Sequence, residues 1–578
     1  MTMLINGTGV SRGIVMGRVR LLHEIQPRAR RKKIKASERR AELSRFRKAV
    51  SRSEAELTRA KQQLPPTGSG TVANILDSNI AMLHDPALVE PIENYISVHK
   101  YSCEWALAVQ RDQLFKMFES IEDPYLRQRS MDVEETIARL LKHLSTRPSK
   151  SKKATQAVQQ FILVSKNLAP SDLIQQQHAG LIGAVTQGGS TLSHTTIIAK
   201  SLRIPLIVSA THAMELLDES DELIIDGKQG TIIANADAAT TKSFKSLQFS
   251  AKKERKQLDQ LKSQATRTKD KQPAQVLANL EDVGEVTKAT RSGAEGVGLF
   301  RTESLFLNRL ELPDEAEHLR VYRGLIKKLK GAPLVVRTMD VWSSRRMPGL
   351  EQHIPVSKQP ALGLRAIRLC LRHPELFLPQ LRALLRASHY GPLSMLLPMV
   401  SNVQEVRDIL QLVDITKANL ERQRFAYNPD MSIGVMVEVP SAAISARLIA
   451  PLVDFMAIGS NDLTQYTLAM DREDANVQPL LDPLNPAILF LINETVKACV
   501  QHDLPVSLCG EMAGDPVYTR LLLGLGLRHF SMHPANILEV KRAILTADVG
   551  KVEKLARSMM RANSPHRTHL LLERINSL

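Results

Sequence analysis

The spacing of apolar residues divides the chain into regions of different secondary structure. Residues 1–24 alternate small and apolar side chains, as in GVSRGIVMGRVRLL, and this predicts a pair of strands. Over residues 36–144 the apolar positions recur at helical spacing with almost no glycine. This pattern predicts one long helix over ERRAELSRFRKAVSRSEAELTRAKQQL, ended by PPTGSG, and three more helices after it. From 155 to 237, short apolar runs alternate with helical stretches and predict a small α/β domain.

From residue 275 onward, strand-like apolar runs end in polar residues and are each followed by a helical stretch. The runs are QVLANL, GVGLFRTE, LVVRTMD, SMLLPMV, GVMVEVP, FMAIGSND, PVSLCGE and HFSMHP. Eight such units in about 300 residues predict a TIM (β/α)8 barrel, in which the chemistry lies at the C-terminal ends of the strands. We therefore expect an α/β multidomain protein. Its predicted parts are an α/β domain of residues 1–24 and 145–240, a helical bundle of 25–144 inserted into it, a linker helix at 241–274, and the barrel at 275–578.

Composition narrows the class of protein. The 578 residues are too many for one hydrophobic core, and no apolar run reaches the roughly 18 residues of a membrane span. The N-terminus, MTMLINGTGV, shows no secretory signal. The cysteines are few and scattered, which suits a reducing compartment better than a disulfide framework. We therefore expect a cytoplasmic protein without membrane insertion.

The formal net charge of +17 is concentrated near the N-terminus, where residues 25–62 hold fourteen lysines and arginines against four acidic residues. Such a segment suits a nucleic acid or an acidic protein, but it also suits a solvated helix face. No aromatic residues are interleaved with the charges for stacking on bases, as the densest stretch, RARRKKIK, shows. We therefore favour the solvated face and do not expect nucleic-acid binding.

Chemically competent side chains follow the predicted barrel strands. Arginine guanidinium groups bind phosphate or carboxylate in a bidentate way, and two carboxylates are hard oxygen ligands suited to a partly hydrated Mg²⁺. A thiol at a strand end can exchange a proton with carbon. Each residue alone also fits a structural ion pair or a buried apolar thiol. Together they predict a pocket for a small phosphorylated acid, built from Arg301, Arg337, Arg365, Arg472, Glu438, Asp462 and Cys509.

The stretch GSTLSHTTIIAKSLRIPLIV, residues 189–208, presents one histidine, His194, at the start of a predicted helix. A neutral imidazole is a competent nucleophile near neutral pH. The free backbone N–H groups of a helix start can also receive the charge of a phosphate. Taken alone, the pattern fits an ordinary loop histidine better than a catalytic one.

These motifs together resemble a known family, enzyme I of the phosphoenolpyruvate-dependent sugar phosphotransferase system and, more broadly, the phosphoenolpyruvate-using enzymes. The SH segment resembles the phosphohistidine signature of that family in altered form. The resemblance covers nearly the whole chain. Its most specific stretches are GAEGVGLFRTESLF (293–306), VVRTMD (335–340), LGLRAIRL (362–369), IGVMVEVPSAA (433–443), IGSNDLTQYTLAMDR (458–472) and CGEMAGD (509–515).

The resemblance implies a mechanism and a set of partners. Phosphoenolpyruvate would bind in the barrel with Mg²⁺ on Glu438 and Asp462, its phosphate and carboxylate held by Arg301, Arg337, Asn461, Asp462 and Arg472. His194, on a swivelling phosphohistidine domain, would take the phosphoryl group and pass it to a histidine of a small carrier protein, similar to HPr, docked on the helical bundle. Cys509 would protonate the remaining enolate to give pyruvate. The barrel would also form a homodimer.

Three stretches depart from the usual sequence of the family. GSTLSH, Gly189–His194, replaces Gly-Gly-Arg-Thr-Ser-His, and VWSSRR, Val341–Arg346, replaces Ile-Gly-Gly-Asp-Lys. LAPS, Leu168–Ser171, replaces Leu-Thr-Pro-Ser, so Ala169 lacks the hydroxyl that orients the imidazole in the family. These changes leave open an alternative: a weakly active or inactive paralogue that binds phosphoenolpyruvate and the carrier as a regulator.

The charge of the helical segment bears on the carrier. In the family this segment meets a carrier with a positively charged contact face, so an acidic docking face is expected. Asp77, Asp85, Glu90 and the stretch ESIED at 119–123 are candidates for an acidic patch. Because the segment begins with a basic helix, we expect a carrier matched to this particular surface.

Overall fold

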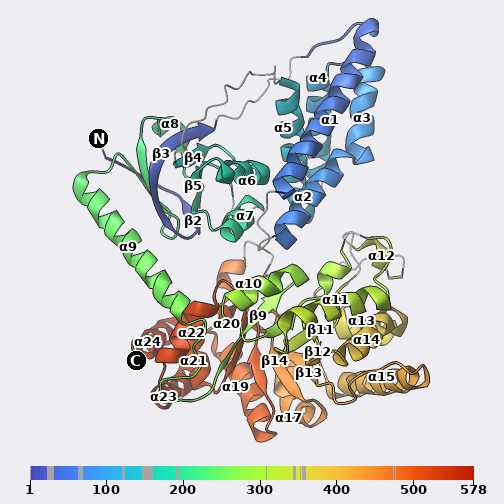
Figure 1. Ribbon diagram of the computed structural model, residues 1–578, viewed down its shortest axis with the longest axis vertical. Helices are drawn as coiled ribbons and strands as arrows, with labels where there is room; N and C mark the ends of the chain where they lie inside the picture. The colour runs from blue at the N-terminus through green and yellow to red at the C-terminus, as the bar shows by residue number, and fades with distance from the viewer. Residues whose placement is uncertain are drawn as a thin grey trace. The chain divides into compact units, whose positions relative to one another are not determined.

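The computed structural model describes residues 2–22, 31–62, 69–119, 124–145, 160–189, 194–307, 309–342, 347–351, 353–354, 359–472, 474 and 477–578. These residues form two compact units, Met1–Lys253 and Glu254–Leu578 (Figure 1). Each unit has its own hydrophobic core. Among the described residues, no helix combines the length and the apolar composition needed to cross a membrane.

The described part of the first unit contains an eight-stranded sheet built from segments on both sides of the helical region. Its order is β1-β8-β7-β3-β4-β5-β6-β2. Strand β3 lies parallel to β4, with Val19 opposite Ile162, although the whole helical region separates them in sequence. The strands are β1 (Met3–Asn6), β2 (Thr8–Ser11), β3 (Ile14–Leu22), β4 (Phe161–Ser165), β5 (Leu181–Thr186), β6 (Leu206–Val208), β7 (Glu222–Asp226) and β8 (Thr231–Ala234).

The predicted strand pair over residues 1–24 is wrong. The segment forms three strands, and none of them pairs with another; β1 pairs with β8 and β2 with β6, both antiparallel. Only Gly7 separates β1 from β2. One residue is too short for a hairpin, which needs at least two.

The helical region of the first unit contains α1 (Arg39–Gln62), α2 (Ser69–Leu83), α3 (Pro86–Ser97), α4 (Cys103–Glu119) and α5 (Pro124–Ser145). Four helices therefore follow the first one among the described residues, not the three that were predicted. The chain breaks at Asp85, whose side chain accepts a hydrogen bond from Ala87 N and caps α3 ahead of Pro86. Phe46, Leu57 and Ile92 are fully buried between the helices.

The second unit is a closed barrel of parallel strands, and β16 closes it by pairing with β9. This confirms the predicted TIM barrel. Its strands are β9 (Gln275–Leu280), β10 (Val297–Phe300), β11 (Leu334–Arg337), β12 (Leu393–Leu397), β13 (Ile433–Val437), β14 (Phe455–Ile458), β15 (Val506–Leu508) and β16 (His529–Met532). Inside the barrel, the apolar side chains of Leu299, Leu396, Met436, Ala457 and Cys509 pack together.

The remaining helices cover the sheet and the barrel. In the first unit they are α6 (Pro170–His178), α7 (His194–Leu202) and α8 (Ala213–Leu216). In the second they are α10 (Val286–Arg291), α11 (Glu315–Leu329), α12 (Pro348–Glu351), α13 (Ala366–Arg372), α14 (Pro374–Ser388), α15 (Val403–Arg422), α16 (Pro440–Ile444), α17 (Ala446–Ile449), α18 (Ser460–Leu468), α19 (Pro486–Gln501), α20 (Glu511–Gly514), α21 (Pro516–Gly524), α22 (Ile537–Thr546), α23 (Val549–Met559) and α24 (Pro565–Ser577).

The helix that connects the two units, α9 (Ala238–Gln260), is shorter than the predicted linker helix at 241–274. After Gln260 the chain turns, and Arg267 and Pro273 form an isolated antiparallel bridge. The side chain of Thr268 accepts a hydrogen bond from Gln272 N at 2.9 Å, so this stretch satisfies its backbone in a turn instead of a helix.

Candidate functional site

The structure brings six of the predicted barrel residues to the carboxyl ends of neighbouring strands. Arg337 ends β11, while Arg301, Glu438 and Cys509 follow β10, β13 and β15 directly; Asn461 and Asp462 lie in the first turn of α18, directly after β14. Arg472 lies beyond the end of α18 and reaches Asp462 with its guanidinium group. Because all strands of a closed parallel barrel point the same way, these residues share one mouth of the barrel.

Two carboxylates at this mouth each keep an oxygen without a hydrogen-bond partner. Glu438 Oε1 accepts from Met399 N at 2.6 Å, and Asp462 Oδ2 accepts from Arg472 Nη1 at 3.2 Å. Among the described residues, the other two oxygens, Glu438 Oε2 and Asp462 Oδ1, are buried and unpartnered. Burial, with the nearby carboxylates of Asp462 and Asp340, raises the pKa of Glu438 to about 8. A cation between these oxygens would relieve both the desolvation and the repulsion.

These carboxylates fit a magnesium ion that is shared with a substrate. The described residues contain no group of three or more His, Cys, Asp or Glu side chains arranged as a metal site. Mg²⁺ is commonly held by one or two carboxylates together with waters and phosphate oxygens. The donor set of Glu438 and Asp462 therefore matches this ion better than one that needs a full protein shell, such as structural zinc.

Two arginines at the mouth each retain an N–H group that no side chain of the described structure accepts. Arg337 donates from Nη2 to Glu303 Oε1 at 2.9 Å, and Arg301 lies 2.9 Å from Glu281 Oε1 through Nη1. The Nε atoms of both arginines are buried and unpartnered. Burial lowers the pKa of Arg337, but the carboxylates of Glu303 and Asp340 outweigh it and raise the pKa above its ordinary value. Arg337 therefore stays charged, and both guanidinium groups have hydrogen-bonding capacity left for an anion.

A buried ion pair stands behind these arginines, and it joins two residues of the quoted motifs, Asp340 and Arg365. Arg365 donates to both carboxylate oxygens of Asp340, from Nε at 2.9 Å and from Nη2 at 2.8 Å. Burial raises the pKa of Asp340, but Arg337 and Arg365 outweigh it and lower the pKa below its usual range. Asp340 is thus committed to holding two guanidinium groups. Trp342 lies with its ring 5.2 Å from the Arg365 guanidinium.

The thiol of Cys509 is buried in the apolar interior of the barrel. Its Sγ donates to Ile458 O at 3.5 Å, and its exposed fraction is 4%. Burial, followed by the charge of Glu438, raises its pKa to about 12. The group therefore stays protonated at neutral pH, which suits a proton donor and not a thiolate nucleophile.

Asn279 supports this thiol and was missed in the sequence. Its Nδ2 donates to Cys509 O at 2.9 Å, and its Oδ1 accepts from Ser531 Oγ at 2.5 Å. The available signal was a carboxamide at the fifth position of the apolar run QVLANL.

The predicted nucleophile lies in the other unit. His194 is the first residue of α7, and the hydroxyl of Thr195 donates to Leu168 O at 2.6 Å, which ties the helix start to the LAPS segment. Ala169 is the N-cap of α6 and makes no side-chain cap bond. Gly189 has φ of +101°, a conformation that favours glycine. The altered residues 190–193 and 343–346 lie outside the described residues.

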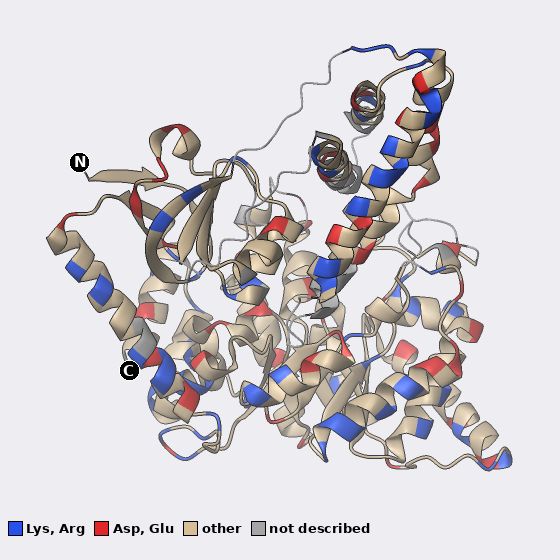
Figure 2. Ribbon diagram, turned by 45° about the horizontal axis from the view of Figure 1, so that its top comes forward, with Lys and Arg blue, Asp and Glu red and all other residues tan. Residues whose placement is uncertain are grey.

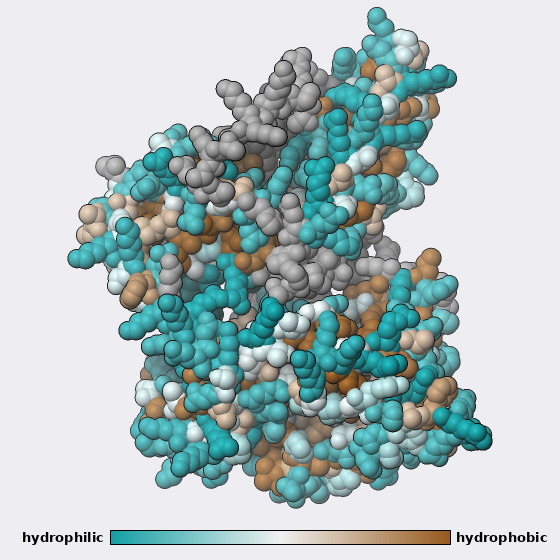
Figure 3. Space-filling view, viewed as in Figure 1, coloured by the Kyte–Doolittle hydropathy of each residue, from teal (hydrophilic) through white to brown (hydrophobic). Residues whose placement is uncertain are grey.

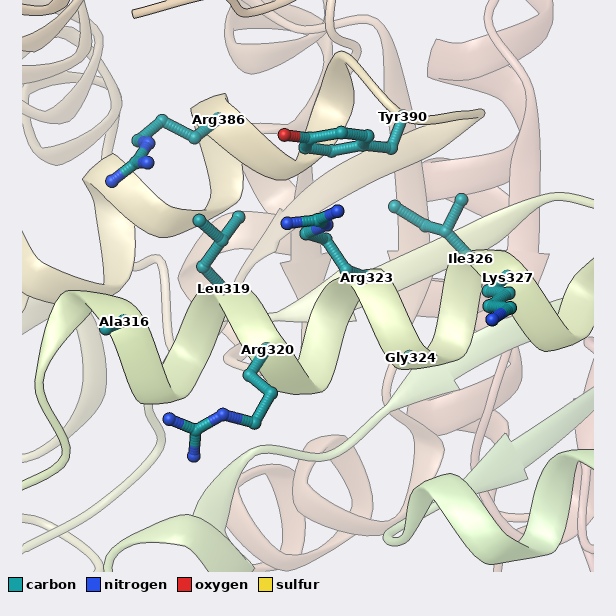
Figure 4. A pocket seen from close by; sticks show the side chains of 9 residues that line it. All are labelled: Ala316, Leu319, Arg320, Arg323, Gly324, Ile326, Lys327, Arg386 and Tyr390. Atoms are coloured by element: carbon teal, nitrogen blue, oxygen red, sulfur yellow. The ribbon is translucent and has the colours of Figure 1, made fainter.

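A hollow on the outer wall of the barrel contains none of the predicted site residues. It measures about 700 Å³ and lies against α11 and the end of α14. In Figure 4, the ring of Tyr390 lies over the guanidinium of Arg323, while Arg320 points away from it. The chemistry of the strand ends is therefore separate from this groove.

Comparison with known proteins finds relatives that match the chain over nearly its whole length. Three family models match it: the N-terminal domain of PEP-utilising enzymes over residues 6–129, their mobile domain over 158–230 and their PEP-binding domain over 255–549. The chain is 39% identical to a phosphoenolpyruvate-protein phosphotransferase of Cupriavidus necator, with 98% of each chain covered. Identity is 35% to the protein of that name from Bacillus subtilis, over 93% of this chain and 94% of the relative. Identity is 34% to the protein of that name from Staphylococcus carnosus, over 96% of this chain and 95% of the relative. The chain therefore belongs to the family of the phosphoenolpyruvate-protein phosphotransferases, which are PEP-utilising enzymes.

Proposed function

We propose that this protein is a phosphoenolpyruvate-protein phosphotransferase. It takes the phosphoryl group of phosphoenolpyruvate onto His194, transfers it to a histidine of a small carrier protein and releases pyruvate. The observation that carries the proposal is the barrel mouth, where two carboxylate oxygens and two guanidinium N–H groups are buried without partners among the described residues. A phosphorylated carboxylic acid with a divalent cation satisfies both kinds of group at once.

Substrate binding is assigned to four residues of the mouth. Arg301 and Arg337 would hold the anionic groups of phosphoenolpyruvate through their remaining N–H groups. Asn461 and Arg472, from the α18 segment, complete the set. Asn461 Oδ1 already accepts from Glu511 N at 2.8 Å, which leaves its amide N–H groups for substrate. Glu438 and Asp462 would hold Mg²⁺, which neutralises phosphate charge and orients the substrate when it is bound.

The transfer itself requires little covalent machinery from the barrel. The imidazole nitrogen of His194 attacks phosphorus, the bond from phosphorus to the enol oxygen breaks, and its electron pair stays on the enolate. As the enolate becomes a ketone, its methylene carbon takes the proton of the Cys509 thiol, which gives pyruvate. The thiolate then recovers a proton from water. Since burial raises the pKa of Cys509 to about 12, the thiol is available as a donor at every pH near neutrality.

The helical region is proposed as the docking site of the carrier, and two of its candidate acidic residues already have partners within the region. Asp77 is paired with Lys61 at 2.6 Å, and Asp85 caps α3. Glu90 is exposed, while residues 120–123 of ESIED lie outside the described residues. Basic residues are spread along α1, with acidic residues between them (Figure 2). We propose a carrier whose contact face is less basic than the family usually meets.

A homodimer formed through the barrel is part of the proposal. Ile444, Leu448 and Phe490 are exposed by 70%, 66% and 53% on α16, α17 and α19, which pack side by side. The face seen in Figure 3 is mostly hydrophilic, with hydrophobic side chains gathered in patches. Burying such a patch against a second copy would be favourable. We also propose a cytoplasmic location, supported by cysteines that are all free thiols.

Labelling with phosphoenolpyruvate tests the function. Purified protein with Mg²⁺ and phosphoenolpyruvate labelled on phosphorus is expected to gain an acid-labile, base-stable label that His194→Ala abolishes. His212→Ala, which removes an exposed histidine of the same unit, should label normally. No label on the wild type would refute the transferase and favour the regulator alternative, which the names of the relatives do not support. Label that persists in His194→Ala would move the acceptor elsewhere.

A further inference from the structure

One buried amide, that of Gln380 on α14, joins the two strand ends that carry the arginines of the mouth. Its side chain is fully buried in the barrel wall. The carbonyl Oε1 accepts from Met339 N at 2.8 Å. The Nε2 group donates to Thr302 Oγ1 at 3.3 Å and to Tyr322 OH at 3.1 Å. Every hydrogen-bonding direction except one carbonyl lone pair is thus used.

The partners of this amide lie between residues of the proposed site. Thr302 stands between Arg301 and Glu303, and Met339 lies between Arg337 and Asp340 in the next segment. The hydroxyl of Thr302 also links the two segments directly, because it donates to Arg337 O at 3.1 Å. Gln380 therefore touches both segments without reaching the mouth itself.

The backbone pairs β10 with β11 up to Phe300 and Val336, and the two segments diverge beyond that point. Arg301 N donates back to Leu280 O of β9, while Thr338 N donates forward to Leu396 O of β12. Within the described residues, no backbone hydrogen bond connects residues 301–305 with 337–341. Beyond the paired strands, side-chain hydrogen bonds therefore link the two segments. The Arg337–Glu303 pair at 2.9 Å and the bonds of Gln380 do so.

The orientation of the amide is fixed from behind. His318 is buried, and burial lowers its pKa to about 4, so its ring is neutral at physiological pH. The Tyr322 hydroxyl lies 3.1 Å from His318 Nδ1 and can donate to that neutral ring. In that arrangement the hydroxyl accepts from Gln380, and Met339 N, which can only donate, fixes the carbonyl on its own side. The amide has one satisfied orientation.

We propose that Gln380 is a positioning residue for phosphoenolpyruvate, which holds Arg301 and Arg337 at the separation that the substrate requires. The inference rests on the proposed function, because it assigns the two arginines to the substrate. Displacing a binding group by about 1 Å costs on the order of 10²-fold in rate. A defect in positioning should therefore appear in kcat/KM for phosphoenolpyruvate far more than in stability.

Gln380→Leu tests this in the full-length protein, because leucine is of similar size and makes none of the three hydrogen bonds. Its matched control is Ser388→Ala on the same helix. Ser388 is also buried, donates to Leu385 O at 2.6 Å and accepts from Asn428 N at 2.9 Å, away from both strand ends. The initial rate of labelling is measured against phosphoenolpyruvate concentration, together with Tm. Gln380→Leu should lose about 10²-fold in kcat/KM, and Ser388→Ala should lose Tm with kcat/KM near the wild-type value.

Two further measurements keep the outcomes distinct. If Gln380→Leu does not fold, Thr302→Val removes the shared hydroxyl isosterically and should show the same kinetic defect. If the wild-type protein takes no label, that result refutes the proposed function but not the positioning role of Gln380. The affinity of the wild type and of Gln380→Leu for phosphoenolpyruvate with Mg²⁺, measured by calorimetry, then tests the positioning role. The inference would be overturned if Gln380→Leu kept the wild-type kcat/KM and affinity. It would also be overturned if Gln380→Leu lost no more kcat/KM than Ser388→Ala does at an equal Tm.

Discussion

Gly510→Ala is the sharpest steric test of the barrel mouth. Gly510 follows Cys509 and is the N-cap of α20, with φ of −80°, a backbone conformation open to any residue. An alanine there carries no backbone strain, but its Cβ would overlap Ser460 Oγ and lie only 2.9 Å from Asn461 Oδ1 and from Ser460 N. The substitution therefore pushes on the first turn of α18, where Asn461 and Asp462 stand.

The size of the effect follows from these distances. Ordinary nonbonded contacts begin near about 3.5 Å, so even the two 2.9 Å approaches require shifts of about 0.6 Å, and the overlap with Ser460 requires more. Overpacking of this kind costs about 1–3 kcal/mol of stability. A displacement of about 1 Å at a binding group costs on the order of 10²-fold in rate. We expect Gly510→Ala to lower Tm and to reduce kcat/KM for phosphoenolpyruvate by about that factor.

Two variants identify the cause. Ser460 Oγ is buried without a partner among the described residues, so Ser460→Ala alone should be harmless, and Gly510→Ala/Ser460→Ala should recover part of the lost rate. Gly324→Ala is the control for adding a methyl group: its Cβ would meet nothing nearer than 3.5 Å, and it should stabilise α11 by up to about 1 kcal/mol. A fully active Gly510→Ala, or a double variant no faster than Gly510→Ala, would refute the steric explanation.

Three further predictions concern stability. Ala169→Thr should supply the missing N-cap of α6 and raise the free energy of unfolding of the first unit by about 1 kcal/mol in denaturant titrations; no gain would contradict the capping argument. Because burial lowers the pKa of His318 to about 4, the unfolded chain binds the extra proton between about pH 6.5 and 4, and stability should fall as the pH is lowered through that window, by up to about 3 kcal/mol. His318→Asn keeps an acceptor for Tyr322 and should flatten that part of the pH profile; an unchanged slope would rule out His318 as its source. Arg139→Met removes the buried partner of Glu135 and Ser171, at 2.7 and 2.8 Å, and should cost about 3 kcal/mol in the same titrations; a loss within error would mean that the pair adds nothing.

The barrel was predictable because its signals are local. Each strand is a short apolar run followed by polar residues at its carboxyl end. Runs such as QVLANL and GVMVEVP therefore predicted both the strands and the end of the barrel at which the candidate site lies. The sheet of the first unit was not predictable in this way. Met3 lies opposite Ala234 across more than two hundred residues, and no local pattern encodes that register.

The same distinction applies to the site. Arg301, Arg337, Glu438, Asp462 and Cys509 were identified by their position after a strand. No sequence pattern identifies contacts that are made by backbone groups or by residues outside the motifs. The 2.6 Å bond from Met399 N to Glu438 and the three bonds of Gln380 on a covering helix became visible only in three dimensions.

Because β16 closes the barrel on β9, the two units can complete their folding at different times during synthesis. The β1–β8 pairing of the first unit is complete once residue 234 has been made, so that unit can fold while the ribosome is still working. The barrel has to wait for residues 529–532, which at ordinary elongation rates emerge roughly 10–50 s after β9. Until β16 emerges, the strands that carry Arg301, Arg337 and Glu438 cannot form a closed barrel, and an unclosed sheet has an unpaired edge that is open to misassembly. The unit that carries the proposed phosphate acceptor, His194, can therefore be complete well before the barrel that would load it.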